Sequence, residues 1–376
     1  MNILVYNPAA LNGGAINILN NFIQDITKDS KNKYWIVVGE EVEDITRVKN
    51  AHISFVNIER SYLKRLRWLY CDIPKFIAKY NIDAVLSFEN TCNVFLKNVP
   101  QYVYLHQSLQ FAPLNTLSWD LYLKIKVLNG LLMKYSCKRA AGVIVQTEWM
   151  SQAVVNNFNI SSSNVHIIPP ELPNYSTEDM DRSIISKVKM LSEEGKYIGI
   201  CVTSAYSYKC LETLVEFVAK YNRSNTSFRI CMLFTISPDQ NAYARDIYSL
   251  AEELHVLQDI IFTGQLTAAT LHQLYNVCDA LFYSSAVETL GFPLVEAMSH
   301  KMRIFAPDLP YVKDVCNKYA VLYQFRDSDH LVKQFIGNFN KTPIEEPQYK
   351  GENFLKAIEI LNNRNNLVLN GKISNE

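Results

Sequence analysis

The sequence predicts an α/β protein with two Rossmann-like, doubly wound domains. Short apolar strands alternate with helical patterns, which indicates parallel sheets, and this alternation restarts in the middle of the chain after a polar stretch. The length agrees with two domains, because 376 residues are too many for one ordinary hydrophobic core.

Eleven apolar runs are predicted as strands. Six lie in the first half, at residues 2–6, 34–39, 52–57, 84–88, 102–106 and 142–146. Five lie in the second half, at residues 197–204, 228–235, 259–264, 280–284 and 303–307. The polar stretch Glu171–Arg182 separates the two sets, so we place the domains at residues 1–175 and 176–345. Residues 346–376 are expected to form a last helix and a frayed polar tail.

Composition and charge exclude several classes of protein. The 37 basic and 37 acidic residues give a net charge of zero, which argues against a nucleic-acid-binding protein. The eight cysteines form no C-x-x-C pair, which favours buried thiols in a reducing compartment over disulfides or zinc. No signal peptide precedes the first strand, and no apolar run approaches the roughly 18 residues that span a bilayer. We therefore expect a cytoplasmic protein.

The stretch Ala280–His300 carries the strongest prediction of a site. A buried strand is followed by a polar turn that closes at Gly291, and a helix begins at Pro293. This order brings a helix N-terminus to the carboxyl edge of a parallel sheet, where open α/β folds bind anions. Two carboxylates, Glu288 and Glu296, flank the turn, so that one can reach a sugar and the other a ribose. From the spacing alone, the alternative is that the glutamate in the first turn of the helix only complements the helix dipole and binds no ligand.

This stretch resembles the retaining nucleotide-sugar glycosyltransferases of family 4, which have the GT-B fold. The segment ETLGFPLVEA, from Glu288 to Ala297, matches the family motif at both glutamates, the glycine and the final alanine. The pair Thr289-Leu290 departs from the usual small residue followed by an aromatic one. The resemblance implies two domains that face a central cleft, with the acceptor in the first and the donor in the second. It also implies that the last helix crosses back onto the first domain.

The same resemblance implies roles for individual residues. Glu288 is expected to hold hydroxyls of the transferred sugar, Glu296 the ribose, and Gly264 to lie near the nucleotide base. His106, Glu288 and Lys209 are the expected catalytic residues. The expected donor-binding residues are Gly13, Gly14, Ser204, Lys209, Gly264, Thr289, Leu290, Gly291 and Glu296.

Lys209 lies between a predicted strand and a predicted helix, where its ammonium would face a diphosphate. From the residues alone a solvated lysine is the alternative, but the family has a lysine in this loop. The family usually has an arginine about five residues earlier, where this chain has Ser204 or Thr203. We expect weaker donor binding, or compensation by these hydroxyls. The glycine that usually follows the motif helix is also absent, with Lys301 near its position.

Two further sites are predicted in the first domain. Gly13-Gly14 follows the first strand but is not a G-x-G-x-x-G fingerprint, which argues against a dinucleotide cofactor. A glycine turn without a ligand is the alternative, and in the family this loop approaches the donor phosphates. His106 ends a strand at the ligand-binding edge, and the resemblance places it against the transferred sugar, with Gln107 and Ser108 near sugar hydroxyls. A structural histidine is the alternative.

The segment Arg60–Tyr70 interleaves basic and apolar residues. As a helix it would carry Arg60, Lys64 and Arg67 near one face, an arrangement that suits an anionic membrane surface. A solvated helix that packs its apolar residues on the sheet is the alternative. A second basic and apolar helix, 121–139, is expected to be ordinary core packing.

No metal or cofactor is expected. The D-x-D spacings at Asp179 to Asp181 and at Asp327 to Asp329 lie near predicted helix starts and do not follow apolar strands. Helix capping explains these acids more simply, as it does Thr147 before the next predicted helix.

The expected function is sugar transfer from a UDP- or GDP-sugar to a hydroxyl of a saccharide or lipid-linked saccharide acceptor. Surface polysaccharide assembly, such as that of an O-antigen or capsule, on the inner face of the membrane is the expected setting. No residue stands out as a covalent nucleophile. Retention of the configuration at the anomeric carbon is therefore implied by the resemblance alone. Two alternatives remain: a catalytically silent GT-B homologue that acts as a scaffold or partner subunit, and a GT-B nucleotide-sugar epimerase.

Overall fold

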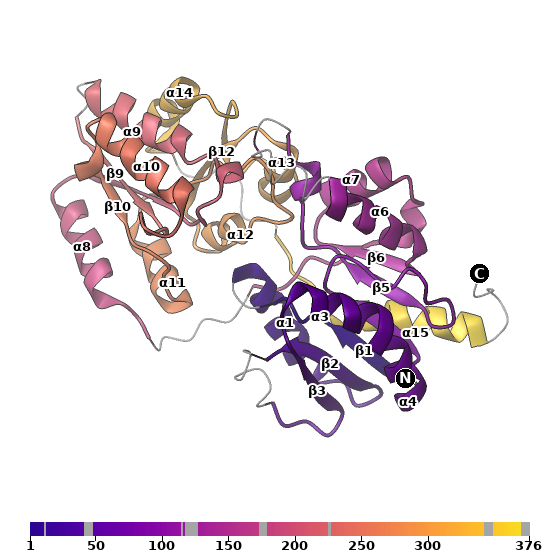
Figure 1. The fold of residues 1–376 in the computed structure, drawn as a ribbon. Helices are drawn as coiled ribbons and strands as arrows, with labels where there is room; N and C mark the ends of the chain where they lie inside the picture. Colours follow the sequence, from indigo (N-terminus) through magenta and orange to yellow (C-terminus); the bar gives the residue numbers. More distant parts are fainter. Residues whose placement is uncertain are drawn as a thin grey trace. The chain divides into compact units, whose positions relative to one another are not determined.

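The computed structural model describes residues 1–10, 13–40, 48–113, 116, 127–172, 179–224, 227–341 and 349–369. The chain divides into two compact units (Figure 1). The first unit comprises Met1–Gln110, Leu123–Pro173 and Lys350–Glu376, and the second comprises Phe111–Tyr122 and Asn174–Tyr349. Each unit is built on its own parallel sheet.

The first unit contains a seven-stranded sheet in the order β3-β2-β1-β4-β5-β6-β7. The strands are β1 Asn2–Tyr6, β2 Lys33–Gly39, β3 Ile53–Ile58, β4 Ala84–Ser87, β5 Gln101–Tyr104, β6 Gly142–Val145 and β7 Val165–Ile167. All neighbouring pairs are parallel. The central strands β4, β5 and β6 are buried along their whole length, which explains why they are short continuous apolar runs.

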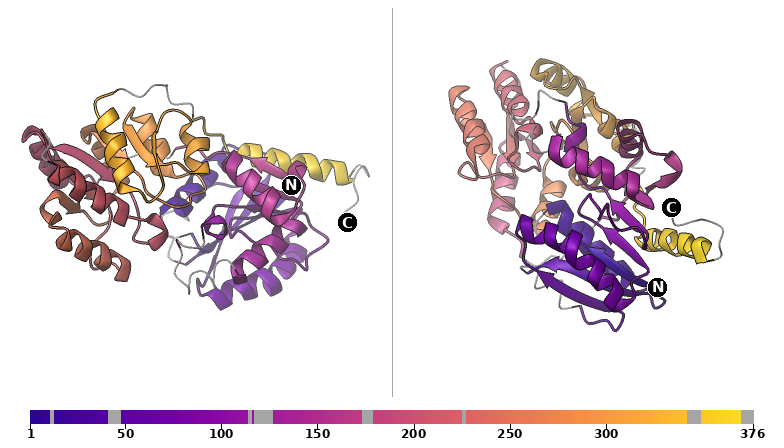
Figure 2. Two further views of the ribbon diagram at one scale, coloured as in Figure 1. Left: turned by 90° about the horizontal axis from the view of Figure 1, so that it is seen from above. Right: turned by 45° about the vertical axis from the view of Figure 1, so that its right-hand side comes forward.

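Helices connect these strands in the doubly wound manner. They are α1 Gly13–Ile26, α3 Tyr62–Arg67, the π-helix η1 Trp68–Asp72, α4 Ile73–Tyr80, the 3-10 turn η2 Leu109–Phe111, α6 Gly130–Arg139, α7 Glu148–Phe158, the 3-10 turn η5 Ser162–Asn164 and α15 Leu355–Leu369. Figure 2 shows α15, in yellow, beside the elements of the first unit. Phe354, just before α15, anchors it there: its ring contacts those of Phe22, Phe88 and Tyr104, and its backbone N–H donates to Asp25.

The second unit contains a six-stranded parallel sheet in the order β10-β9-β8-β11-β12-β13. The strands are β8 Tyr197–Cys201, β9 Ile230–Phe234, β10 Ile260–Phe262, β11 Ala280–Phe282, β12 Arg303–Pro307 and β13 Val321–Tyr323. Gly199 of β8 lets the sheet pack tightly, because a β-carbon there would lie 2.8 Å from the Phe282 ring. In both sheets the first and fourth strands of the unit are neighbours at the centre, which is the Rossmann order.

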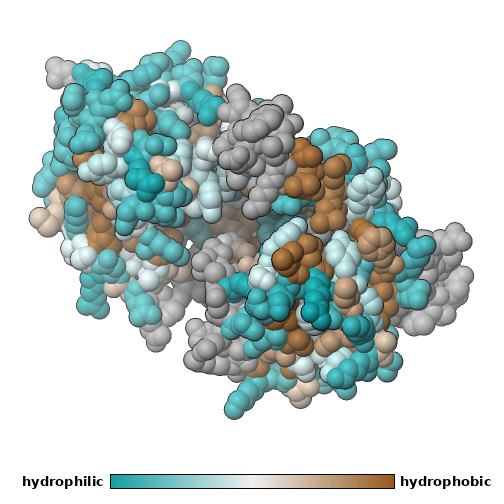
Figure 3. Space-filling view, viewed as in Figure 1, coloured by the Kyte–Doolittle hydropathy of each residue, from teal (hydrophilic) through white to brown (hydrophobic). Residues whose placement is uncertain are grey.

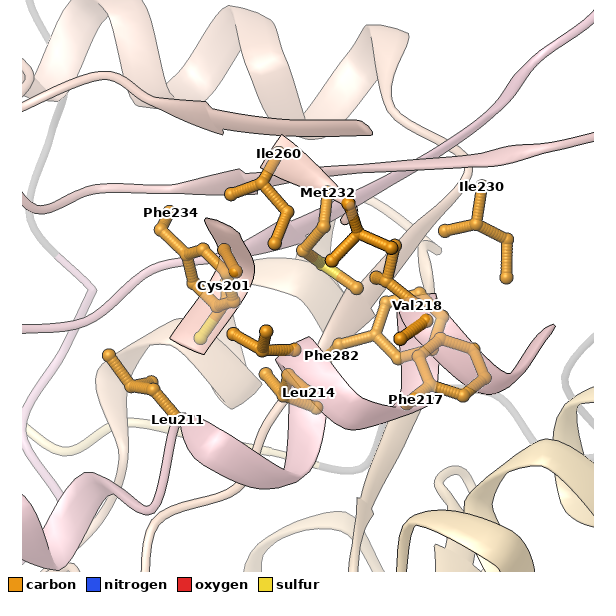
Figure 4. Packing of buried hydrophobic residues seen from close by; sticks show 14 of the residues in the cluster. Cys201, Leu211, Leu214, Phe217, Val218, Ile230, Met232, Phe234, Ile260 and Phe282 are labelled. Carbon is orange, nitrogen blue, oxygen red and sulfur yellow. The ribbon is translucent and has the colours of Figure 1, made fainter. Parts of the chain in front are cut away.

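Helices of the second unit form two layers. The helices and 3-10 turns are α8 Arg182–Glu193, η6 Ser207–Lys209, α9 Glu212–Arg223, α10 Ala242–Glu253, η7 Leu257–Asp259, α11 Ala268–Val277, α12 Phe292–Ser299, α13 Pro310–Cys316 and α14 Ser328–Asn338. α9 packs against α10 and α14, whereas α8 packs against α11 and α12 against α13. Between α9 and the sheet lies an apolar core, in which the Phe217 and Phe282 rings are in contact at a centroid distance of 5.1 Å (Figure 4).

The predicted α/β fold class is confirmed, with differences in detail. β7 and β13 have only three residues each and were not predicted. Residues 310–316 form helix α13, because a proline at the first helical position favours a helix start. Thr147 caps α7 as predicted, accepting a hydrogen bond from the Met150 N–H.

Caps also explain the two D-x-D spacings. Asp181 accepts from the Ser183 and Ile184 N–H groups at the start of α8, and Asp327 accepts from the His330 N–H at the start of α14. The eight cysteines are free, and all but Cys71 are buried. None of the helices in the described ranges is both long and apolar enough to cross a membrane.

Candidate functional site

The carboxyl ends of β8 and β11 lie at the switch point of the second sheet, where the chain leaves neighbouring strands in opposite directions. Open α/β sheets bind ligands in the crevice outside such a point. The loops that follow these two strands contain six predicted site residues: Ser204, Lys209, Glu288, Thr289, Leu290 and Gly291.

Lys209 and Glu288 form an ion pair at this switch point. Lys209 Nζ lies 2.5 Å from Glu288 Oε1, and the two side chains are only 12% and 17% exposed. Burial by itself would lower the pKa of Lys209, but the Glu288 carboxylate and, to a lesser degree, Tyr208 together raise it above its usual value. The structure therefore brings together two predicted residues that lie 79 positions apart.

Two hydrogen bonds to backbone carbonyls join the loops that carry this pair. The Ser284 hydroxyl donates to the Lys209 carbonyl at 2.7 Å, and the Ala286 N–H donates to the Tyr208 carbonyl at 2.8 Å. The position of Lys209 is thus fixed by the loop that carries Glu288.

Two buried tyrosines donate hydrogen bonds to backbone carbonyls of the segment that leads to Glu288. The Tyr311 hydroxyl donates to the Ser285 carbonyl at 2.6 Å, and the Tyr323 hydroxyl donates to the Tyr283 carbonyl at 2.7 Å. Burial raises the pKa of the Tyr283 hydroxyl well above its usual value, and the Glu288 carboxylate adds to the effect. The sequence analysis did not find Tyr311 or Tyr323. Tyr323 ends the apolar run of β13, whereas Tyr311 lies within α13 and carried no such signal.

Helix α12 begins directly after the turn. Gly291 is its N-cap, with a φ of 74° in the left-handed region that glycine tolerates best. Gly291 offers no side chain to cap the helix, and Pro293 lies in its first turn. Backbone N–H groups at a helix start favour an anion, so this end of α12 adds positive potential beside Lys209 and Glu288.

Glu296 lies further along α12 and is oriented by α11. Its side chain is 8% exposed, and its Oε2 accepts a hydrogen bond from the Tyr275 hydroxyl at 2.7 Å. Leu290 is buried and packs as a core residue. Gly264, two residues after β10, has a φ of 71° and open space where a β-carbon would be. Ser204 is partly buried near Tyr208.

The remaining predicted residues belong to the first unit. Gly13 and Gly14 form the first turn of α1, whereas the sequence analysis placed them in the preceding loop. The helix extends this far because the N–H groups of its second turn need carbonyl acceptors four residues earlier. His106 follows β5 and is partly buried, and Ser108 is buried. The Gln107 N–H donates to Asn90.

Sequence reasoning missed a polar cluster at the switch point of the first sheet. Glu89, after β4, accepts from the Ala9 N–H and from Arg65, both at 2.7 Å. Burial raises the pKa of Glu89, although Arg65 acts in the opposite direction. An acid directly after a buried apolar strand was the available signal.

The predicted helix from Arg60 begins two residues later, because Ser61 caps α3 and accepts from the Lys64 N–H. Arg60 lies outside the helix and donates to the Ala10 carbonyl. In 121–139, residues up to 126 lie outside the described ranges. α6 buries Met133 but exposes Leu131 and Tyr135, so only part of this segment is core. Figure 3 shows hydrophobic side chains reaching the surface of this unit.

Comparisons with known proteins agree on the fold. The chain is 22% identical over 218 residues to the O-antigen chain mannosyltransferase RfbU of Salmonella typhimurium, covering 58% of this chain. It spans just over half the length, 56%, of that relative. A glycosyltransferase from Rickettsia africae superposes with a TM-score of 0.66 at 14% identity, covering 98% of this chain and 93% of the other. Anabaena HepE in complex with UDP-glucose gives 0.66 at 16% identity, covering 99% and 100%.

These neighbours and the two Rossmann-like sheets identify the GT-B fold. The model of the family described as Glycosyl transferases group 1 matches residues 183–371, just over half of the chain, and includes β8, β11 and α12 with the Lys209–Glu288 pair. The chain therefore belongs to the Glycosyl transferases group 1 family.

Proposed function

We propose that this glycosyltransferase is a retaining enzyme of family 4 that moves a hexose from a nucleoside diphosphate to a hydroxyl acceptor. The observation that carries the proposal is the Lys209–Glu288 pair at the switch point of the second sheet, beside the start of α12. A cation, a carboxylate and a helix N-terminus are the groups that a diphosphate and an adjoining sugar require.

The chemical difficulty is the charge that develops as the bond between sugar and diphosphate breaks. Lys209 and the start of α12 would stabilise the departing diphosphate, which is electrostatic preorganisation. Glu288 would hold the hydroxyls beside the positively charged anomeric carbon, and Glu296 would bind the ribose. The turn before α12 would line the donor-binding site, and Gly264 would lie near the nucleotide base.

The first unit would bind the acceptor. His106 would contact the transferred sugar, and Gly13-Gly14 would add the positive end of α1 to the phosphates. We propose that transfer retains the anomeric configuration and needs no metal. Proton NMR of the first product formed reports the anomeric configuration, and an inverted product would refute retention. Loss of turnover in EDTA, restored by Mg²⁺ or Mn²⁺, would refute metal independence.

The donor is a UDP- or GDP-hexose in this proposal, and the acceptor is a saccharide or lipid-linked saccharide. Two similar proteins support this choice of donor and acceptor: one relative is an O-antigen mannosyltransferase, and one structural neighbour is in complex with UDP-glucose. We therefore propose a role in surface polysaccharide assembly at the cytoplasmic face of the membrane. A thermal-shift panel of UDP- and GDP-sugars identifies the donor, because a ligand that binds only the folded state raises the melting temperature.

We also propose that the segment Arg60–Tyr70 contacts an anionic membrane surface. The Leu63 side chain is 77% exposed and that of Arg67 is 69% exposed. Replacing Lys64 and Arg67 together by Glu should abolish binding to vesicles that contain phosphatidylglycerol. The same double change at the exposed lysines Lys187 and Lys189 of α8 is the control, and equal loss in both would refute the assignment.

Incubation with labelled UDP- and GDP-sugars tests the activity itself. Slow release of free nucleotide supports the transferase, isomerised sugar would identify an epimerase, and absence of binding would identify a silent scaffold. Glu288→Ala should mainly lower turnover, whereas Glu296→Ala should mainly weaken nucleotide binding. Wild-type behaviour of both variants would refute the assignment of the site.

A further inference from the structure

Asn90 and His106 meet at the carboxyl edge of the first sheet. Asn90 lies three residues after β4, and His106 lies two residues after β5, which pairs with β4. The Asn90 side chain makes three contacts with the loop that carries the histidine. These contacts constrain the chemical state of the imidazole.

The backbone determines the orientation of the Asn90 amide. Asn90 Oδ1 accepts from the His106 N–H at 2.8 Å and from the Gln107 N–H at 3.1 Å. Backbone N–H groups can only donate, so the atom that faces them must be the amide oxygen. The amide nitrogen of Asn90 therefore points the other way, and it can only donate.

The amide nitrogen in turn determines the tautomer of His106. Asn90 Nδ2 lies 3.4 Å from His106 Nε2, which must act as the acceptor and carry no proton. Burial lowers the pKa of His106 to about 4, so the ring is neutral at pH 7 and carries one proton. That proton lies on Nδ1.

In this arrangement, and within the described ranges of the chain, His106 Nδ1 is left without a hydrogen-bond acceptor. The atom is buried and has no hydrogen-bond partner among the described residues. The Glu89 carboxylate, one residue before Asn90, already accepts from the Ala9 N–H and from Arg65. The Tyr104 ring lies 6.3 Å away, centroid to centroid, and its hydroxyl accepts from Gln146.

We infer that Asn90 is a positioning residue that holds His106 as the neutral Nδ1–H tautomer, so that the imidazole offers a hydrogen-bond donor to a saccharide oxygen. The identity of the ligand rests on the proposed function, whereas the tautomer follows from contacts within the first unit. A histidine held in this way is a donor at Nδ1 and does not act there as a base.

The backbone at Asn90 allows the side chain to be changed cleanly. Its φ of 60° is left-handed, a conformation that Asn, Asp and Gly tolerate better than other residues. Asn90→Asp keeps the acceptor for the two N–H groups but replaces the donor to Nε2 by a second acceptor. Asn90→Gly removes both. Asn159, left-handed at the end of α7 with a φ of 56°, provides the matched control Asn159→Asp.

Nitrogen-15 NMR of the full-length protein labelled at histidine tests the tautomer without any ligand. Subtracting the spectrum of His106→Gln isolates one of seven histidines. Wild type and Asn159→Asp should show Nδ1 protonated at pH 7, and Asn90→Asp should show Nε2 protonated. An Nε2–H wild type, or an unchanged tautomer in Asn90→Asp, would overturn the inference.

A second measurement tests the donor role with UDP-glucose at millimolar concentration. Binding to Nδ1–H should shift that protonated nitrogen resonance in wild type, whereas Asn90→Asp should show no protonated Nδ1 resonance with or without the ligand. No shift in wild type overturns the donor role and leaves the tautomer result standing. Failure of the proposed function would instead appear as a nucleotide-sugar panel in which nothing raises the melting temperature.

Discussion

Lys209 and Glu288 neutralise each other in a site that excludes most water. Removing one partner leaves a charge that is both desolvated and unpaired, which is the costly way to break such a pair. Because both side chains retain some exposure, we expect Lys209→Met or Glu288→Gln alone to lower the free energy of unfolding by about 2 kcal/mol. The double variant should lose much less free energy of unfolding than the two single variants lose together. Urea unfolding of all four proteins measures this coupling.

The matched control is the ion pair of Lys313 and Asp308, whose side chains are 58% and 48% exposed. Such surface pairs contribute at most about 1 kcal/mol, so Lys313→Met should change stability little. Equal losses at Lys209 and Lys313 would contradict a desolvated pair at the switch point.

His106 should make stability depend on pH. Its pKa is lowered from 6.5 to about 4 by burial, so between these values the unfolded chain binds a proton that the folded chain does not. The free energy of unfolding should therefore fall as the pH falls through this window, by about 3 kcal/mol between pH 7 and pH 4. His106→Gln should lack this part of the slope in urea titrations from pH 7 to pH 4. Parallel slopes in the two proteins would show that His106 titrates normally.

Sequence reasoning placed Lys209 and Glu288 in loops that follow strands, and the structure has both residues in such loops. Sequence reasoning could not find Asn90 or Tyr323, because their roles depend on partners far along the chain. The Tyr323 hydroxyl bonds a carbonyl 40 residues away, and Asn90 bonds a loop 16 residues away. Such contacts depend on strand order and register, which no local pattern contains.

At the scale of elements, α12 ends in a motif for which glycine is the usual residue. The Met302 N–H donates to the Ala297 carbonyl and the Lys301 N–H to the Met298 carbonyl, which is the Schellman arrangement. Lys301 must therefore adopt a φ of 55°, which costs about 1 kcal/mol for a residue with a side chain. We expect Lys301→Gly to stabilise the protein by about this amount in thermal unfolding.

Helix α8 offers the reverse change as a control. Gly195 occupies the same position, with a φ of 81°, and the Lys196 N–H donates to the Leu191 carbonyl. Nothing lies within 4 Å of where a β-carbon would be, so Gly195→Lys tests conformation without a clash. It should destabilise by about 1 kcal/mol. Stabilisation by Gly195→Lys would contradict the argument for both helices.

The N-terminal end of α12 also requires a left-handed residue, and here the chain has glycine. Gly291 has a φ of 74°, and a β-carbon there would lie 3.1 Å from Leu294 and 3.4 Å from the Tyr283 hydroxyl. Gly291→Ala should therefore destabilise the protein by about 2 kcal/mol, from conformation and crowding together. Gly337→Ala, in the ordinary helical backbone of α14 with open space around it, should instead be neutral or stabilising. Thermal unfolding of both variants measures the difference.

The strands that sequence analysis missed, β7 and β13, have three residues each and lie at an edge of their sheets. β7 and β13 are strands only because β6 and β12 already present an edge to which three residues can pair. The longer runs, such as 34–39, were predictable because several buried residues in succession require a sheet. Gly13 and Gly14 were misplaced for a related reason: hydrogen bonding within α1, not residue preference, sets its first turn.

At the scale of the whole molecule, each sheet has a switch point between its first and fourth strands, β1 with β4 and β8 with β11. Alternating strands and helices in the sequence predicted two parallel sheets, and the right-handed crossover rule limits their topology. The strand order itself depends on tertiary pairing. The polar clusters, Glu89 with Asn90 in one unit and Lys209 with Glu288 in the other, lie at the edges that this order creates.

A nucleoside diphosphate should therefore protect only part of the chain from hydrogen exchange. A ligand at 100 times its Kd stabilises its bound state by about 2.7 kcal/mol, which slows exchange through local opening of the loops it contacts about 100-fold. We expect this protection by UDP or GDP at residues 202–211 and 283–292, after β8 and β11, and none in β2 and β3 at the outer edge of the first sheet. Exchange followed by mass spectrometry measures it. Lys209→Ala should reduce the effect at matched ligand concentration, because the ammonium contributes to affinity. Protection confined to β2 and β3 would exclude the second sheet's switch point as the nucleotide site.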